Sequence, residues 1–407
     1  MILKIITFVG MIRKYKSVQQ ASMVMLVLFA MGLGLQSFFG AFPLAILAYP
    51  VNLITTVLLL LVAGLCCKLL STHRITRFLS SGATALSALF FIGLMALVFG
   101  LTHQQTDAHD IPARLGIRAM TSYYPFVLSY LYLLIALSFA TFRRLKWELS
   151  VLNVGFFLNH AGLLIVLLSI GLGTADKLQL RAKVKEGQQI TKATAQSGRN
   201  HDLPFSLQLV DFEIQTYLPK LAIIDVQTGK YLPEGAPSFY DVDSAASSFE
   251  LLQHHFLLLK YIDQASPDEK GGYQAADDNG FPPAVWLQAD GKSSWVTCGN
   301  WQVPYRMFGL SATQSLVMLN PEARSYESLV QITQNGNEFQ QRIAVNRPLH
   351  LGAWSVYQSS FDATQGKASS FSVFQLIYDP WKNLTQVGLA MLILGALSLF
   401  WGYQKKS

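Results

Sequence analysis

The chain has 407 residues, of which 51% are hydrophobic and 14% are charged, and its formal net charge is +7. Soluble domains carry about 25% charged residues. The composition therefore excludes a disordered chain, a collagen-like chain and a small disulfide scaffold, and it argues against an ordinary soluble enzyme. It is typical of a membrane protein.

Six apolar stretches are long enough to cross a bilayer, which takes about 20 residues in a helix. The sequence predicts spans at residues 20–40, 49–68, 81–102, 121–141, 152–174 and 384–403. The first two come from one uncharged run, Val18 to Cys67, which would be divided near Gly40–Pro43 or at Pro50. We expect a polytopic α-helical membrane protein with six transmembrane helices.

The basic residues flanking the spans orient the chain by the positive-inside rule. With a cytoplasmic N-terminus, twelve of the 31 basic residues and one of the 24 acidic residues fall on the inner side. The other side then holds an excess of acidic residues. We therefore expect a multi-pass protein of a bacterial cytoplasmic membrane, with both termini in the cytoplasm and residues 176–382 outside.

Residues 176–382 form the one long polar segment, between the fifth and sixth spans, and their pattern is that of β-strands. Phe205, Leu207 and Leu209 alternate with polar residues, and a phase slip at Val210 indicates a β-bulge. Asn335-Gly336 is a strong hairpin signal between two apolar runs. The sequence therefore predicts a large extracytoplasmic, mainly-β domain between helices five and six.

Other parts of this segment are assigned in the same way. Asp290-Gly291 predicts a second hairpin, and 221–226 and 371–377 read as strands. We expect a loop with little core at Ser266–Pro283 and a helix near Phe249–Tyr261. The predicted division of the chain is an N-terminal transmembrane hairpin (1–78), three further transmembrane helices (79–175), the extracytoplasmic β domain (176–382) and a C-terminal transmembrane helix (383–407).

Several kinds of chemistry are absent from the sequence. The three cysteines form neither a CxxC nor a CxxCH motif, so the chain is neither a thioredoxin-like protein nor itself a c-type cytochrome. There is no phosphate-binding glycine loop, HExxH or GxSxG motif. The outer segment is net acidic and topology accounts for the basic clusters, so we expect no nucleic-acid partner. No residue can be assigned as catalytic.

His160 is the histidine that lies well inside a predicted span. An ionisable group at that depth is costly and is typically functional. One interpretation is a neutral imidazole that hydrogen-bonds to a neighbouring helix, with Asn159 nearby. The other is an axial ligand to haem, because neutral imidazole is the commonest iron donor.

His103 and His109 are weaker candidates at the outer end of the third span. They occur in the run from His103 to Asp110, where haem or metal ligation and a solvated loop are both compatible with the pattern. We favour the loop. No metal other than haem iron is expected.

Two stretches resemble ResB/CcsB-type cytochrome c biogenesis proteins. The basic turn Arg143–Lys146 and the span Phe157–Gly171 are similar to that family's third conserved span, which has a histidine in its first part and a terminal glycine. Trp354–Asp362 and Tyr378–Trp381 are similar to the element that ends the family's outer domain. Leu203–Tyr217 looks like its first outer strand. The resemblance covers about residues 80–407, so the first two spans are additional to the family core.

The resemblance implies a role in system II cytochrome c maturation. Proteins of this type act with a ResC/CcsA-type membrane partner to deliver haem b to the outer face and to attach it covalently to apocytochrome c. The partner carries a tryptophan-rich haem-handling segment, whereas the seven tryptophans here are scattered. The chain therefore resembles the separate B-type subunit of a holocytochrome c synthase, which does not complete the reaction alone. The resemblance implies that His160 is an axial haem ligand.

Two other functions remain open at this point. The chain could be a non-catalytic membrane scaffold or chaperone that holds apocytochrome or the partner by its outer β domain. It could also be a component of a small-molecule transporter, although the sequence shows no inverted repeat of the kind that transporters have.

Overall fold

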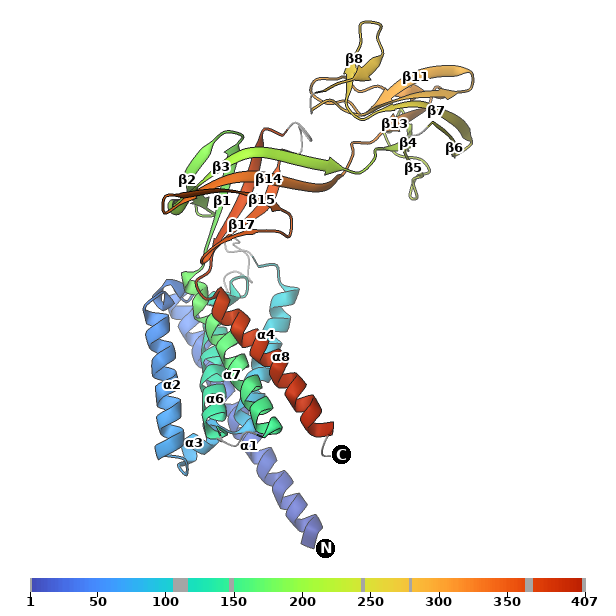
Figure 1. The fold of residues 1–407 in the computed structure, drawn as a ribbon. Helices are drawn as coiled ribbons and strands as arrows, with labels where there is room; N and C mark the ends of the chain where they lie inside the picture. The colour runs from blue at the N-terminus through green and yellow to red at the C-terminus, as the bar shows by residue number, and fades with distance from the viewer. Residues whose placement is uncertain are drawn as a thin grey trace. The chain divides into compact units, whose positions relative to one another are not determined.

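The computed structural model describes residues 2–104, 116–145, 150–242, 246–277, 280–362 and 369–404. The chain divides into two compact units, one of residues 1–177 with 378–407 and one of residues 178–377 (Figure 1). The first unit is helical and the second is built from antiparallel strands.

The helical unit contains six helices that are long and apolar enough to cross a membrane. Their bounds are α1 (Ile2–Phe39, apolar from Ser17), α2 (Val51–Leu69), α4 (Gly82–Leu101), α6 (Tyr124–Arg143), α7 (Val151–Gly171) and α8 (Lys382–Gln404). Shorter elements lie beside them: α3 (Arg74–Leu79) and the 3-10 turns η1 (Leu44–Leu47), η2 (Met120–Ser122) and η3 (Gly173–Asp176). Of these, η3 follows α7 and leads into the second unit. Each predicted span overlaps one of the six long helices, so the prediction of a six-span protein is confirmed.

α6 is the central helix of this unit. Of the residues in its membrane-length segment, 61% are buried, whereas in the other five helices the share is 11–28%. It contacts α1, α2, α4 and α7. Buried hydroxyls on α6, such as those of Ser129 and Ser138, donate hydrogen bonds to carbonyl groups one turn earlier. These bonds satisfy hydroxyl groups for which lipid offers no hydrogen-bond partner. The apolar outer faces of the surrounding helices are the surfaces that lipid would contact.

Glycines spaced seven residues apart allow α7 and α8 to approach closely. Gly155 and Gly162 of α7 face α8, which presents Gly388, Gly395 and Gly402. A Cβ on Gly162 would lie 2.8 Å from the carbonyl oxygen of Gly388. Small residues permit backbone contact of this kind between membrane helices, and α7 and α8 form the most extensive contact between helices.

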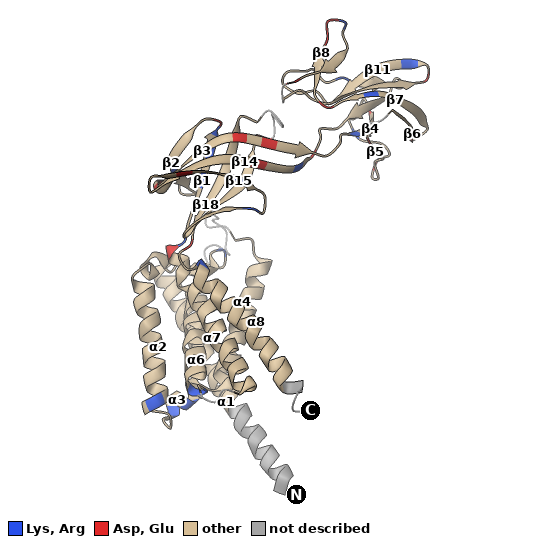
Figure 2. Cartoon of the chain, viewed as in Figure 1, with Lys and Arg blue, Asp and Glu red and all other residues tan. Residues whose placement is uncertain are grey.

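The charges of the helical unit are distributed unevenly (Figure 2). Basic residues gather at the end of the unit that holds α3 and the C-terminal ends of α2 and α6, where Lys68, Arg74, Arg77 and Arg143 lie. The opposite end of the unit holds η1, which joins α1 to α2, and η3, which leads from α7 into the second unit.

The larger sheet of the second unit has eight strands in the order β15-β14-β3-β2-β1-β18-β17-β16. Their bounds are β1 (Leu178–Lys185), β2 (Gln189–Ala195), β3 (Asn200–Thr216), β14 (Ala323–Gln334), β15 (Asn337–Ala344), β16 (Leu349–Leu351), β17 (Trp354–Phe361) and β18 (Phe371–Tyr378). The bulge predicted at Val210 is confirmed, because Leu329 pairs with Asp211 whereas Val330 pairs with Leu209. The hairpin at Asn335-Gly336 is confirmed too, with both residues at positive φ.

Two four-stranded sheets form a sandwich. One has the order β11-β10-β7-β6 and the other β12-β13-β4-β5, and Phe256, Leu287 and Leu316 belong to the core that joins them. The bounds are β4 (Lys220–Asp225), β5 (Phe239–Asp241), β6 (Ser247–Leu251), β7 (His254–Ile262), β10 (Ala284–Ala289), β11 (Lys292–Thr297), β12 (Phe308–Gly309) and β13 (Gln314–Met318). Asp290-Gly291 makes the predicted hairpin between β10 and β11.

Two expectations for this region were wrong. The helix expected near Phe249–Tyr261 is instead the hairpin of β6 and β7, with Phe249 paired to Phe256. Its leucine-rich run has good intrinsic helix propensity, but burial of alternate residues in the sandwich overrides this preference. The loop expected at Ser266–Pro283 contains a short ribbon of β8 (Ala265–Pro267) and β9 (Tyr273–Ala275), and Tyr273 is buried in a small core of its own.

The sandwich strands lie in sequence between two strands that are neighbours in the eight-stranded sheet. β3 ends at Thr216, which pairs with Ala323 at the beginning of β14, so the chain leaves and rejoins the sheet at adjacent positions. The amide of Tyr217 also donates a hydrogen bond of 2.9 Å to the carbonyl of Glu322.

The glycine contact between α7 and α8 predicts opposite effects for two identical substitutions. In Gly162→Ala the added methyl meets backbone atoms of α8, which no side-chain rotation relieves, so we expect a loss of about 1–3 kcal/mol in stability. Gly93 in α4 has no atom within 4 Å of its Cβ position, so Gly93→Ala should be neutral or gain up to about 1 kcal/mol from helix propensity. Thermal unfolding of the detergent-purified protein measures both. Equal melting temperatures for the two variants would contradict the assigned helix contact.

Candidate functional site

α7 begins at a capped end and carries His160 near its middle. The hydroxyl of Ser150 accepts a hydrogen bond of 3.3 Å from the amide of Asn153, which satisfies one of the free N–H groups of the first turn. His160 is the tenth residue of this 21-residue helix. At about 1.5 Å per residue it lies close to the midpoint of the span.

The imidazole of His160 is held by its own helix. Nδ1 lies 3.0 Å from the carbonyl oxygen of Phe156, one turn earlier. The ring also stacks on the Phe156 ring, with centroids 3.8 Å apart and planes inclined by 26°. Both contacts fix the orientation of the imidazole without help from another helix.

This geometry determines which tautomer the neutral imidazole of His160 adopts. A carbonyl oxygen can only accept a hydrogen bond, so Nδ1 carries the proton and Nε2 retains its lone pair. Within the described part of the chain, Nε2 has no hydrogen-bond partner. His160 is half-buried, so part of the residue is accessible from outside this chain. An oriented neutral imidazole with an open Nε2 is the form of histidine that ligates iron and other metal ions.

Asn159 and His160 are adjacent in sequence but serve different contacts. The amide of Asn159 donates a hydrogen bond of 3.1 Å to the carbonyl of Gly155, and its backbone lies under Gly395 of α8. Asn159 therefore belongs to the contact between α7 and α8. His160 makes its observed hydrogen bond within α7, to the carbonyl of Phe156. This partner differs from the one expected if a neighbouring helix bound the imidazole.

No described contact joins His103, one of the two weaker histidine candidates, to His160. His103 is exposed just beyond the end of α4, and its backbone carbonyl, not its ring, accepts a hydrogen bond from Arg118. His109 lies outside the described residues. Among the residues that the structure describes, no three His, Cys, Asp or Glu side chains are grouped as a metal site.

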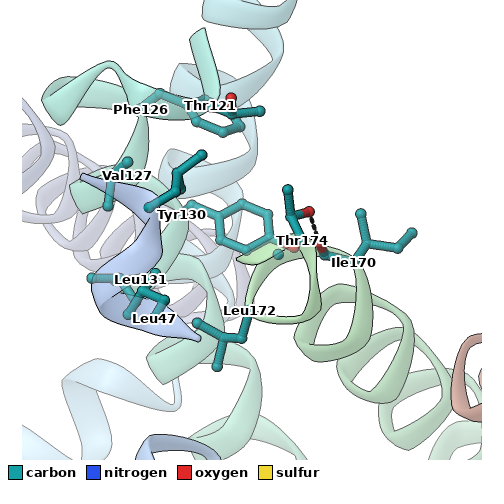
Figure 3. A pocket seen from close by; sticks show the side chains of 11 residues that line it. Leu47, Thr121, Phe126, Val127, Tyr130, Leu131, Ile170, Leu172 and Thr174 are labelled. Carbon is teal, nitrogen blue, oxygen red and sulfur yellow. Dashed lines mark hydrogen bonds between the residues drawn. The ribbon is translucent and has the colours of Figure 1, made fainter. Parts of the chain in front are cut away.

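An apolar hollow at the η1 and η3 end of the helical unit does not fit a haem-sized ligand. It is lined by residues of η1, α6 and the end of α7, with the Tyr130 ring between Leu131 and Thr174 (Figure 3). Its volume is about 150 Å³, below the range of about 300–1,000 Å³ for pockets that enclose such ligands. No histidine, cysteine, methionine or acidic side chain is among its described lining residues.

Gln358, which lies in one of the motifs singled out in the sequence, is structural. It is buried in β17, and its side chain accepts a hydrogen bond of 2.7 Å from Ser328 of β14 and donates one of 3.2 Å to Ser372 of β18. Every member of this group has a partner in the sheet, which is the condition for a buried polar network to be stable. The Gln358 side chain therefore connects three strands, and its hydrogen bonds are used within the sheet.

Sequence reasoning missed a polar cluster around Asp176. This carboxylate accepts hydrogen bonds from the amide of Tyr49 at 2.7 Å, from the side chain of Asn52 at 2.7 Å and from the indole of Trp381 at 2.8 Å. It thereby connects the beginning of α2, the turn after α7 and the residue before α8. Trp381 lies against Gly173, where a Cβ would be 2.6 Å from the indole. The partners are up to 205 residues apart, so sequence spacing offered no signal.

The three donors determine the ionisation of Asp176. Partial burial by itself raises the pKa of the carboxyl, but the hydrogen bonds from Trp381, Tyr49 and Asn52 outweigh burial and hold the pKa below its ordinary value of 3.8. The group is therefore an anion at neutral pH. An anion with three N–H donors is a fixed connection between chain segments.

The comparisons with known proteins concern the second half of the chain. A model of the ResB-like family matches residues 150–246 and 296–373. The matched segments contain α7 with His160 and most of the eight-stranded sheet, whereas β6 to β10 fall in the gap. No curated protein matches the sequence.

The Asp176 cluster predicts a pH dependence of stability. Because the folded-state pKa is below its ordinary value, the stabilisation is present at neutral pH and is lost as the pH falls from about 4 through the folded-state pKa. Asp176→Asn should lower the melting temperature by a few degrees at neutral pH and should flatten the profile below pH 4, measured by thermal unfolding. Asp202→Asn is the control, because the ion pair of Asp202 with Lys192, at 3.1 Å, is exposed and contributes little. Parallel profiles for wild type and Asp176→Asn would contradict the assignment.

The one cysteine of the β unit, Cys298, should be chemically inert. Burial raises the pKa of its thiol to about 12, so almost no thiolate is present near pH 8. Iodoacetamide should label Cys298 only after the protein is unfolded, as mass spectrometry of the native and denatured samples can establish. Rapid labelling of the native protein would show that the thiol is exposed and able to take part in exchange.

Proposed function

The chain belongs to the ResB-like family, and from this membership we propose that it acts with a ResC/CcsA-type membrane partner in system II cytochrome c maturation. Membership of the family indicates involvement in cytochrome c biogenesis, and the six long apolar helices make the chain a multi-pass membrane protein. The proposal adds the partner, haem delivery to the outer face and covalent attachment of haem to apocytochrome c. In this proposal the chain is a non-autonomous subunit of a holocytochrome c synthase.

The proposed orientation follows from the charge distribution. The end of the helical unit that holds Lys68, Arg74, Arg77 and Arg143 is assigned to the cytoplasm of a bacterial cell, because cytoplasmic loops are enriched in Lys and Arg. The β unit, residues 178–377, is then extracytoplasmic. It is the part of the chain that can meet an apocytochrome at the outer face.

His160 is proposed as one axial ligand of haem b while the haem is being handled. The observation that carries this proposal is the fixed imidazole, with Nδ1 directed at the Phe156 carbonyl and Nε2 open. Haem supplies the iron and the vinyl groups to which cysteine thiols are joined. His160 would contribute its lone pair and no proton transfer. The partner would contribute the second ligand.

In this proposal the chain acts mainly by positioning the reacting groups and supplies few catalytic side chains. Joining a thiol to a haem vinyl group depends mainly on bringing the two together, which is an effect of proximity and orientation. The thiol of Cys298, whose pKa is raised to about 12, is not suited to exchange with substrate cysteines. The β unit would hold apocytochrome or the partner at the outer face, and His160 of α7 would ligate the iron.

Replacement of His160 tests the proposed function. In the full-length protein co-purified with its membrane partner, His160→Ala should reduce haem content and cytochrome c yield by more than about tenfold, since loss of a mere supporting group of a ligand already costs 10–100-fold in affinity. Haem absorption and the amount of holocytochrome are the measurements. His103→Ala is the matched control, because His103 is exposed and outside the His160 site.

The outcomes separate the proposed function from the scaffold alternative. Unchanged haem content with unchanged cytochrome yield would remove His160 from haem handling. Unchanged haem in the partner, together with loss of yield when the β unit is disrupted, would favour a non-catalytic scaffold. Loss of both readouts in His160→Ala, with His103→Ala like wild type, is the result we expect.

A further inference from the structure

Two adjacent arginines at the end of α6 have different surroundings. Arg143 donates a hydrogen bond from Nη1 to the hydroxyl of Ser80, in the segment between α3 and α4. Arg144 instead places its guanidinium over the ring of Phe156, with Cζ 4.9 Å from the ring centroid. The second arginine is therefore directed along α7.

Phe156 contacts both this guanidinium and the imidazole of His160. The His160 ring stacks on the Phe156 ring with centroids 3.8 Å apart, and Arg144 Cζ lies 4.9 Å from the centroid of the same ring. The Phe156 ring therefore links the guanidinium to the imidazole through two direct contacts.

A basic residue at the end of a span has an ordinary explanation, which is that its charge reaches the interface while its stem covers apolar surface. That explanation fits Arg143 and Arg144 equally. It does not account for the contact of Arg144 with Phe156, the ring on which the one histidine of α7 stacks. Arg143 instead donates its hydrogen bond to Ser80. The arrangement places a planar carboxylate-binding group beside an open metal-binding nitrogen.

Haem has the matching distribution of groups. It is a flat apolar ring with a central iron, and its two propionate carboxylates project from one edge, several ångströms from the iron. A ligand held at Nε2 of His160 would extend past the apolar Phe156 ring, and Arg144 is the cation beyond that ring. Arginine binds carboxylates by paired, charge-assisted hydrogen bonds.

We propose that Arg144 binds a propionate carboxylate of the haem whose iron is ligated by His160, and that Phe156 sets the distance between the two contacts. This inference rests on the proposed function, because it requires haem at His160. Arg144 is a positioning residue here. It would select for haem that carries free carboxylates and would fix the rotation of the ring about the iron–imidazole bond.

The test compares haem b with its dimethyl ester, in which the propionates carry no charge. The full-length protein, with whatever partner co-purifies, is titrated with each compound in detergent and followed by absorption. Arg144→Gln should weaken binding of haem b by about tenfold, the effect of losing one charge-assisted hydrogen bond, and should leave binding of the ester unchanged. Arg144→Lys should recover part of the affinity for haem b, because it restores the charge but not the paired geometry.

Two matched variants make the outcomes distinct. Arg143→Gln removes the same charge one residue away and should change neither affinity. His160→Ala should weaken both compounds equally, since both contain the iron.

Equal effects of Arg144→Gln on haem b and the ester, or none on either, would overturn the role of Arg144 while leaving His160 as a ligand. The second of these results would fit an arginine that meets only a lipid phosphate. Unchanged binding in His160→Ala, or no binding by the wild type, would overturn the proposed function and this inference with it.

Discussion

The carboxylate of Asp176 is the connection on which the arrangement of the helical unit depends. It joins α2, the end of α7 and the beginning of α8 through three N–H donors, and Trp381 can approach because residue 173 has no side chain. Burial disfavours the charged form and the donors favour it, and the donors prevail. The second span, which lies outside the residues matched by the family model, is thus bonded to the turn that follows the matched α7.

A second constraint acts along α7. Glycines at intervals of seven residues pack against α8, and leucines such as Leu164 and Leu168 pack against α6. His160 precedes Leu164 by four residues and Leu168 by eight, so it lies on the same side of α7 as these leucines. Its hydrogen bond and its ring contact nevertheless come from its own helix. The imidazole is therefore oriented by α7 itself and is half-buried.

Periodicity in the sequence predicted the features that depend on local pattern. The six spans, the bulge at Val210 and the two Asn-Gly and Asp-Gly hairpins follow from apolar length, a phase slip and residues that tolerate positive φ. The region around Phe249–Tyr261 was assigned incorrectly because leucine-rich runs suit a helix as well as a strand, and only the partner sheet decides between them. His160 was identifiable because an ionisable residue inside an apolar span is rare. The partners of Asp176 and the contact of Arg144 with Phe156 could not be identified from the sequence, because both depend on how separate helix ends meet.

The connection from β3 to β14 gives the β unit the organisation of an insertion within an insertion. The ends of the β unit belong to β1 and β18, which are neighbouring strands, and the sandwich in turn departs and returns where Thr216 meets Ala323. Each added module thus has entry and exit points side by side, so it can be lengthened, shortened or exchanged without altering the hydrogen-bond ladder of its host sheet. The gap in the family match, residues 247–295, falls inside the inner module. Divergence among relatives can accumulate there while the eight-stranded sheet keeps its register.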